Sequence, residues 1–123
     1  MQICPWLQEY IDVARHTAGD KVIGIYPELK DPEWLNSLSI MNGNKFEDIV
    51  LDMLHSNGYT ERSDRCFVQS FSEASLVYVA PRTRLPLIML REVDAPNDTL
   101  ARHGRITTLT LDEASVMYLG PRY

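Results

Sequence analysis

The sequence predicts an α/β fold with a parallel sheet. Three apolar, strand-like segments, 21–29, 66–71 and 85–93, alternate with segments of helical character. Strands separated by helices indicate crossover connections, which make the joined strands parallel. The run Leu87-Ile88-Met89-Leu90 is apolar on both faces, as is typical of parallel strands covered on both sides. So few strands leave both edges of the sheet open, and a piece cut from a larger α/β barrel would show this pattern.

The N-terminal part of the chain predicts a helix, a strand and a loop. A helix is expected over 5–14, because apolar residues lie there near helical spacing: Trp6, Tyr10, Val13 and Ala14. The strand over 21–29 contains Pro27, which has no amide hydrogen to donate to a ladder. We therefore expect a bulge or a strand end at Pro27, followed by a long mixed loop over 31–43.

The clearest helix is expected over 45–57. Its apolar residues lie at i, i+3, i+4, i+7 and i+8: Phe46, Ile49, Val50, Met53 and Leu54. Asn44 and Glu47 are spaced as a capping box, and Gly58 is placed as a C-terminal stop.

The C-terminal half predicts two further helices. Ser70 and Glu73 are spaced to cap a helix over 72–80. A loop is expected over 94–98, after the strand over 85–93. A last helix is expected over 110–119, where a Gly-Pro pair ends it.

Composition and charge favour a small globular domain. The chain has 123 residues, of which 45% are hydrophobic and 24% charged, with a net charge of −5. Its Lys and Arg residues are scattered, which disfavours a nucleic-acid surface. No apolar stretch reaches the roughly 18 residues of a transmembrane helix. The two cysteines, Cys4 and Cys66, are too few for a disulfide scaffold, and we expect Cys66 to be a small buried residue.

Two charged residues at the end of the first strand are the clearest candidates for chemistry. Glu28 and Lys30 are two residues apart, so in a strand their side chains point to the same face. A carboxylate beside an ammonium suits a cation site with a phosphate or a water next to it. The pattern alone leaves a second interpretation open, in which the strand has reached solvent and the charges are ordinary surface charges.

The segment Gly24-Ile25-Tyr26-Pro27-Glu28-Leu29-Lys30-Asp31-Pro32 resembles a motif of the glycerophosphodiester phosphodiesterase family. That family is a TIM barrel that hydrolyses glycerophosphodiesters to glycerol 3-phosphate and an alcohol. Weaker similarities lie in the family's order before and after this motif: 5–10, 66–71, 86–90 and 119–121. The resemblance implies that residues 1–123 are a partial domain of this family, roughly strands 4 to 6 of the (β/α)8 barrel with their flanking helices.

The resemblance also implies roles for particular residues. Glu28 matches an acidic metal ligand, and Lys30 matches an active-site lysine near the phosphate. Gln69 and Phe71 match positions that line the substrate pocket, although ordinary barrel packing stays open as an alternative for both. The implied cofactor is a divalent cation, Ca²⁺ or Mg²⁺, because hard cations prefer oxygen ligands. This chain would supply only part of its coordination shell.

The same resemblance implies that other parts of the site are absent from this chain. The family's His-Arg, Glu-x-Asp and His-Asp pairs have no counterpart here, and no histidine matches a catalytic position: His16, His55 and His103. We therefore expect the chain by itself not to hydrolyse glycerophosphodiesters, and to self-associate through exposed apolar surface. Two alternatives remain, a small non-catalytic α/β binding module and a pseudoenzyme relic of the barrel.

Overall fold

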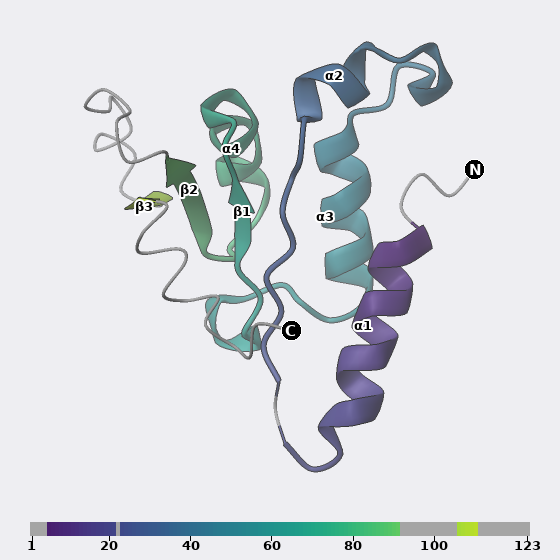
Figure 1. Cartoon of the computed structure of the whole chain (residues 1–123), viewed down its shortest axis with the longest axis vertical. Helices are drawn as coiled ribbons and strands as arrows, with labels where there is room; N and C mark the ends of the chain where they lie inside the picture. The colour runs from purple at the N-terminus through teal and green to yellow at the C-terminus, as the bar shows by residue number, and fades with distance from the viewer. Residues whose placement is uncertain (1–4, 22, 92–105, 111–123) are drawn as a thin grey trace.

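The parallel sheet is present. The computed structural model describes residues 5–21, 23–91 and 106–110. Strands β1 (Val68–Ser70), β2 (Leu87–Arg91) and β3 (Ile106–Thr110) form one sheet in the order β1-β2-β3, and both pairs are parallel. Figure 1 shows β3 at one edge of this sheet. The three parallel strands are consistent with part of a TIM barrel.

The segment around Pro27 is extended but is not a continuous strand. It joins β1 through two isolated parallel bridges, Ile25 with Cys66 and Glu28 with Gln69. The Gln69 amide donates to the Pro27 carbonyl at 3.0 Å, and the Leu29 amide donates to the Gln69 carbonyl at 2.8 Å. The expected interruption at Pro27 is therefore confirmed, because the missing amide divides the ladder.

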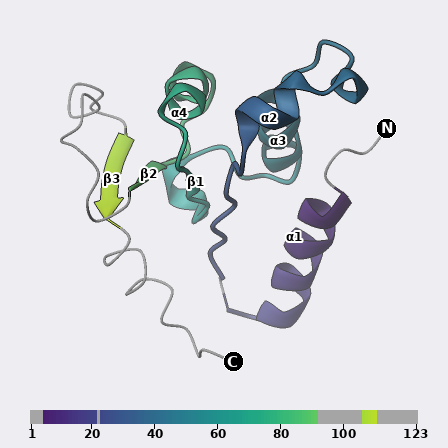
Figure 2. The same ribbon diagram turned by 45° about the horizontal axis from the view of Figure 1, so that its top comes forward.

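Four α-helices accompany the strands within the described ranges. They are α1 (Pro5–Ala18), α2 (Pro32–Ser37), α3 (Phe46–Ser56) and α4 (Glu73–Val79). Short 3₁₀ turns lie between them: η1 (Ser39–Met41), η2 (Arg62–Asp64) and η3 (Ala80–Arg82). In both Figure 1 and Figure 2 the extended segment runs between β1 and the pair α1 and α3.

The main core lies between the sheet and the helices. One register row of the sheet, Val68, Leu87 and Ile106, belongs to this core. Helix residues pack against the row, among them Leu54 and Leu76, which are both fully buried. The alternate residues of the strands point to the other face, where Ile88 and Leu90 form a smaller cluster with Phe67.

Two expectations about secondary structure were wrong. The predicted loop over 31–43 contains α2 and η1. Pro32 at the start of α2 has a φ angle already suited to a helix, and the Asp31 carbonyl accepts the Leu35 amide at 3.0 Å.

No strand was expected over 106–110, yet β3 lies there, built from β-branched and apolar residues. Thr110 ends β3 and does not open a helix; the rest of 110–119 and the loop over 94–98 lie outside the described residues.

The expected helix caps also needed correction. The Asn44–Glu47 capping box does not form, because α3 begins after Lys45, and Asn36 Oδ1 accepts the Phe46 amide at 2.7 Å. Gly58 is confirmed as a C-terminal stop, with a φ of 89° that glycine adopts easily.

For α4 the N-cap is Ser72, which accepts the Ser75 amide; the predicted cap, Ser70, lies two residues earlier. Helix α1 forms as expected, but the residues that signalled it, Trp6, Tyr10 and Val13, are exposed. Ile11 is buried in their place, with Leu7 and Ala14 packed against the core.

Candidate functional site

Glu28 and Lys30 lie on the same face, as the sequence predicts. Along the extended segment Pro27 and Leu29 are buried, whereas Glu28 and Lys30 are exposed. Leu29 belongs to the main core, so its burial directs the charged residues on either side to the opposite face. That alternation places a carboxylate and an ammonium together at the C-terminal end of the segment.

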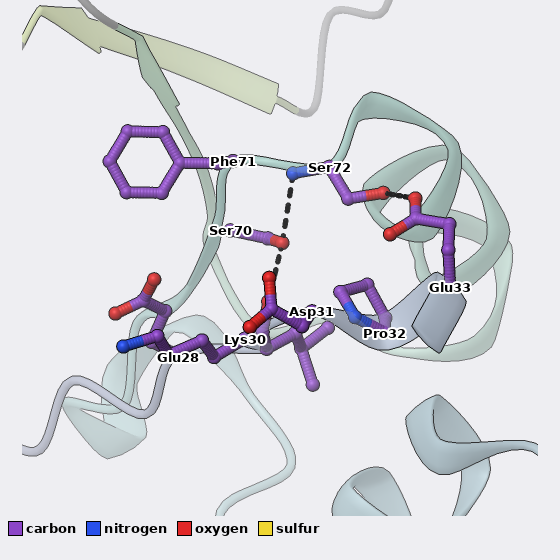
Figure 3. A pocket seen from close by; sticks show the side chains of 9 residues that line it. Glu28, Lys30, Asp31, Pro32, Glu33, Ser70, Phe71 and Ser72 are labelled. Carbon is purple, nitrogen blue, oxygen red and sulfur yellow. Dashed lines mark hydrogen bonds between the residues drawn. The ribbon is translucent and has the colours of Figure 1, made fainter. Parts of the chain in front are cut away.

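A hollow of about 520 Å³ lies at this end of the sheet. Its lining residues come from two neighbouring chain segments: Glu28, Leu29, Lys30, Asp31, Pro32, Glu33, Ser70, Phe71 and Ser72. One segment ends the extended stretch and opens α2, and the other ends β1 and opens α4. Figure 3 shows the Glu28 and Lys30 side chains on the side of the hollow where the Phe71 ring lies.

The hollow carries more negative than positive charge. Three carboxylates line it, from Glu28, Asp31 and Glu33, against the single ammonium of Lys30. Within residues 5–21, 23–91 and 106–110, no three His, Cys, Asp or Glu side chains lie close enough to hold a metal ion. The described part of the chain therefore offers single carboxylate ligands and not a closed metal site.

The carboxylates of the hollow differ in what they contact. Glu33 accepts a hydrogen bond from the Ser72 hydroxyl. Neither the Glu28 carboxylate nor the Lys30 ammonium has a hydrogen bond or an ion pair with another described residue. Both groups are thus open to a ligand in the hollow.

Two serines connect the walls of the hollow. The Ser70 hydroxyl donates to the Leu29 carbonyl at 2.7 Å and accepts the Ser72 amide at 3.0 Å (Figure 3). The Ser72 hydroxyl accepts the Ser75 amide at 3.2 Å while donating to Glu33. These bonds join the end of the extended segment and the start of α2 to the loop between β1 and α4.

Phe71 and Gln69 occupy different positions. Phe71 lines the hollow, and 47% of its surface is exposed. Gln69 is buried and is not among the lining residues; its side-chain amide donates to the Tyr26 carbonyl at 3.3 Å. The hollow thus brings together three of the predicted site residues: Glu28, Lys30 and Phe71. Gln69 lies outside the hollow and forms a parallel β-bridge with Glu28.

The described histidines lie elsewhere. His55, on α3, is hydrogen bonded to the Thr83 hydroxyl at 3.0 Å, and His16 is exposed on α1. Neither lines the hollow, and His103 lies outside the described residues. Cys66 is fully buried, as expected, and this burial raises the pKa of its thiol to about 12.

Sequence reasoning missed the other four polar residues that line the hollow: Asp31, Glu33, Ser70 and Ser72. Asp31 directly follows Lys30, and Glu33 lies in the first turn of α2, where a loop was expected. Ser70 was predicted only as a helix cap and Ser72 only as the start of that helix. Their contacts with Leu29 and Glu33 depend on how β1 pairs with a segment about forty residues earlier.

The charged residues of the hollow lie at the C-terminal ends of β1 and of the extended segment that pairs with it in parallel, and α/β barrels carry their active sites at such ends. A scan of family models finds none that matches the chain. The chain is 36% identical to glycerophosphodiester phosphodiesterase GDPD6 of Arabidopsis thaliana over 92% of its own length. It spans 32% of the length of that relative. The chain is therefore similar to about a third of the length of a glycerophosphodiester phosphodiesterase.

Among the described residues, no helix combines the length and the apolar character needed to cross a membrane.

Proposed function

We propose that this chain forms one wall of the active site of a metal-dependent hydrolase that cleaves glycerophosphodiesters to glycerol 3-phosphate and an alcohol. One observation carries the proposal. Glu28, Lys30 and Phe71 line a single hollow at the C-terminal ends of β1 and of the extended segment that pairs with it in parallel. Similarity to a glycerophosphodiester phosphodiesterase supports the phosphodiesterase class.

Glu28 is the proposed metal ligand. Its carboxylate is exposed in the hollow and is the oxygen donor that Mg²⁺ and Ca²⁺ prefer. Three carboxylates around the hollow would repel an anionic phosphodiester, so binding of this substrate calls for a cation. A bound cation would neutralise phosphate oxygens and orient the attacking group. Since a hard cation takes six or more oxygen ligands, Glu28 would be one ligand of a larger set.

Lys30 is the proposed catalytic cation of the chain itself. Its ammonium is a compact point donor that can stabilise negative charge on the phosphoryl oxygens as it develops. The exposed Phe71 ring gives the same hollow an apolar side, suited to the carbon skeleton of the glycerol or alcohol part. Gln69 would support the hollow from outside, because its backbone pairs with the segment that carries Glu28.

General acid–base catalysis at neutral pH needs a group such as histidine. The catalytic histidines of the family and its remaining carboxylates are proposed to come from polypeptide outside these 123 residues. We therefore propose that the chain alone is inactive.

The test measures release of glycerol 3-phosphate from glycerophosphodiesters by the longest natural polypeptide that carries this segment, and in parallel by the 123-residue chain. We expect metal-dependent turnover, lost on chelation, from the long polypeptide and none from the short chain. Metal-dependent turnover by the short chain that Glu28→Ala abolishes would contradict its proposed inactivity. A long polypeptide without turnover would favour the binding module or the relic of the barrel.

A further inference from the structure

Ser70 joins the two segments that carry the site residues. It is the last residue of β1 and is fully buried. Its hydroxyl makes two hydrogen bonds at once, to the Leu29 carbonyl at 2.7 Å and from the Ser72 amide at 3.0 Å. Figure 3 shows these bonds between the walls of the hollow.

The partners of Ser70 are the neighbours of the proposed site residues. Leu29 lies between Glu28 and Lys30 in the chain, and Phe71 lies between Ser70 and Ser72. Leu29 is buried, so its backbone has little freedom to shift by itself. One hydroxyl thus links the backbone that carries the two charged groups to the backbone that carries the aromatic ring.

We propose that Ser70 is a positioning residue, which sets the place of Glu28 and Lys30 relative to Phe71 without touching the substrate. This inference rests on the proposed phosphodiesterase function. Replacing Ser70 with alanine removes the donor to the Leu29 carbonyl and the acceptor for the Ser72 amide. Both ends are then free to shift, and a shift of about 1 Å in a catalytic group can lower a rate on the order of 100-fold.

Ser75 provides a matched control. It is also a buried serine, and its hydroxyl donates to Glu47 Oε1 at 2.8 Å. It lies on α4 and is not among the residues that line the hollow. Ser75→Ala therefore removes a buried hydroxyl bond of the same kind, to a residue outside the hollow, and keeps the backbone amide that donates to Ser72.

The experiment compares Ser70→Ala and Ser75→Ala in the longest natural polypeptide that carries this segment, with kcat and KM corrected for the folded fraction. Ser70→Ala is expected to lower kcat by up to about 100-fold with KM nearly unchanged, whereas Ser75→Ala keeps the wild-type kcat. Equal kcat values for the two variants would overturn the inference. If Ser70→Ala fails to fold, Ser70→Thr keeps the hydroxyl and is expected to keep kcat; a folded Ser70→Thr variant with a low kcat would also overturn it.

Amide hydrogen exchange tests the same bridge without any assay of hydrolysis. The Ser72 amide is expected to exchange faster in Ser70→Ala than in the wild type, and at the wild-type rate in Ser75→Ala. Unchanged protection of this amide in folded Ser70→Ala would overturn the inference. A wild-type protein that hydrolyses nothing would contradict the proposed function, and the exchange result would still decide whether Ser70 holds the two segments together.

Discussion

Two glutamates of this chain occupy opposite environments. Glu28 is exposed at the end of the extended segment and has no partner among the described residues. Glu47, on α3, is 4% exposed and accepts hydrogen bonds from Asn36 Nδ2 at 2.9 Å and from the Ser75 hydroxyl at 2.8 Å. The same functional group is thus left open to a ligand in one region and fully engaged by protein in the other.

Glu47 has a structural role. Its two partners lie on α2 and α4, so a single carboxylate joins three helices. Asn36 also accepts the first amide of α3, from Phe46. Each oxygen of this buried carboxylate thus accepts a hydrogen bond, as buried polar groups in folded proteins usually do.

The cations show the same contrast. The Lys45 ammonium and the Arg82 guanidinium lie over the Tyr78 ring, at 4.1 and 3.6 Å from its centroid. The Tyr78 hydroxyl donates to Asp48, with both carboxylate oxygens at 2.9 Å. Lys30 has no such contact within the described residues. Lys45, Arg82 and Asp48 therefore all contact Tyr78, whereas the Glu28 and Lys30 side chains have no such contact with a described residue.

A large effect on catalysis is expected at Lys30. In the longest natural polypeptide, Lys30→Met should lower kcat for glycerophosphodiester hydrolysis on the order of 100-fold, because it removes a cation that stabilises developing phosphoryl charge. Lys21→Met is the control, since Lys21 is an exposed lysine outside the hollow. Steady-state kinetics check both variants. Equal kcat values for the two would show that the Lys30 charge is an ordinary surface charge.

Glu47→Ala is expected to affect folding and not the site. Loss of the carboxylate removes the acceptor of Asn36 Nδ2 and of the Ser75 hydroxyl, at a cost of about 1–3 kcal/mol in the free energy of unfolding. Urea unfolding followed by circular dichroism measures this cost, with the exposed Glu9→Ala as control. An unchanged unfolding midpoint for Glu47→Ala would contradict the structural role.

A smaller effect is expected from Cys66 at high pH. Burial raises the pKa of this thiol from 9.0 to about 12, so the unfolded chain loses the proton first as pH rises. The folded state therefore loses stability as the pH rises between those two values. Below pH 9.0 the stability that the buried, protonated thiol contributes is fully present. Urea midpoints across this range should fall less steeply in Cys66→Ala.

Some slope remains in Cys66→Ala, since burial and the bond to Asp48 also raise the pKa of Tyr78. Identical slopes in the wild type and Cys66→Ala would exclude the thiol as a source of the pH dependence.

The sequence predicted what depends on local spacing. The apolar period over 45–57, the parallel sheet and the shared face of Glu28 and Lys30 are all present in the structure. The apolar period and the shared face follow from the geometry of a helix or a strand, which a few consecutive residues determine. The parallel sheet was inferred from the alternation of strands and helices. β3 was not predicted, because five residues rich in threonine carry no clear alternation of apolar and polar side chains.

The features that sequence reasoning missed depend on distant contacts. Asn36 caps α3 from a preceding helix, so no capping box could reveal it. Ser70 reaches Leu29 only because β1 pairs with the extended segment in one particular register. The spacing of Trp6 and its apolar neighbours correctly predicted helix α1, but Trp6 is exposed. Ile11 is the buried residue of this helix, because tertiary packing and not spacing decides which face is covered.

Glu28 is thus proposed to bind the metal ion, and Glu47 to stabilise the folded structure. The most direct test places Glu28→Gln and Glu47→Gln separately in the longest natural polypeptide and measures kcat and the urea midpoint for each. Glu28→Gln should lower metal-dependent turnover on the order of 100-fold or more with an unchanged midpoint, and Glu47→Gln should lower the midpoint while keeping the turnover of each folded molecule. Wild-type turnover in Glu28→Gln would contradict the account.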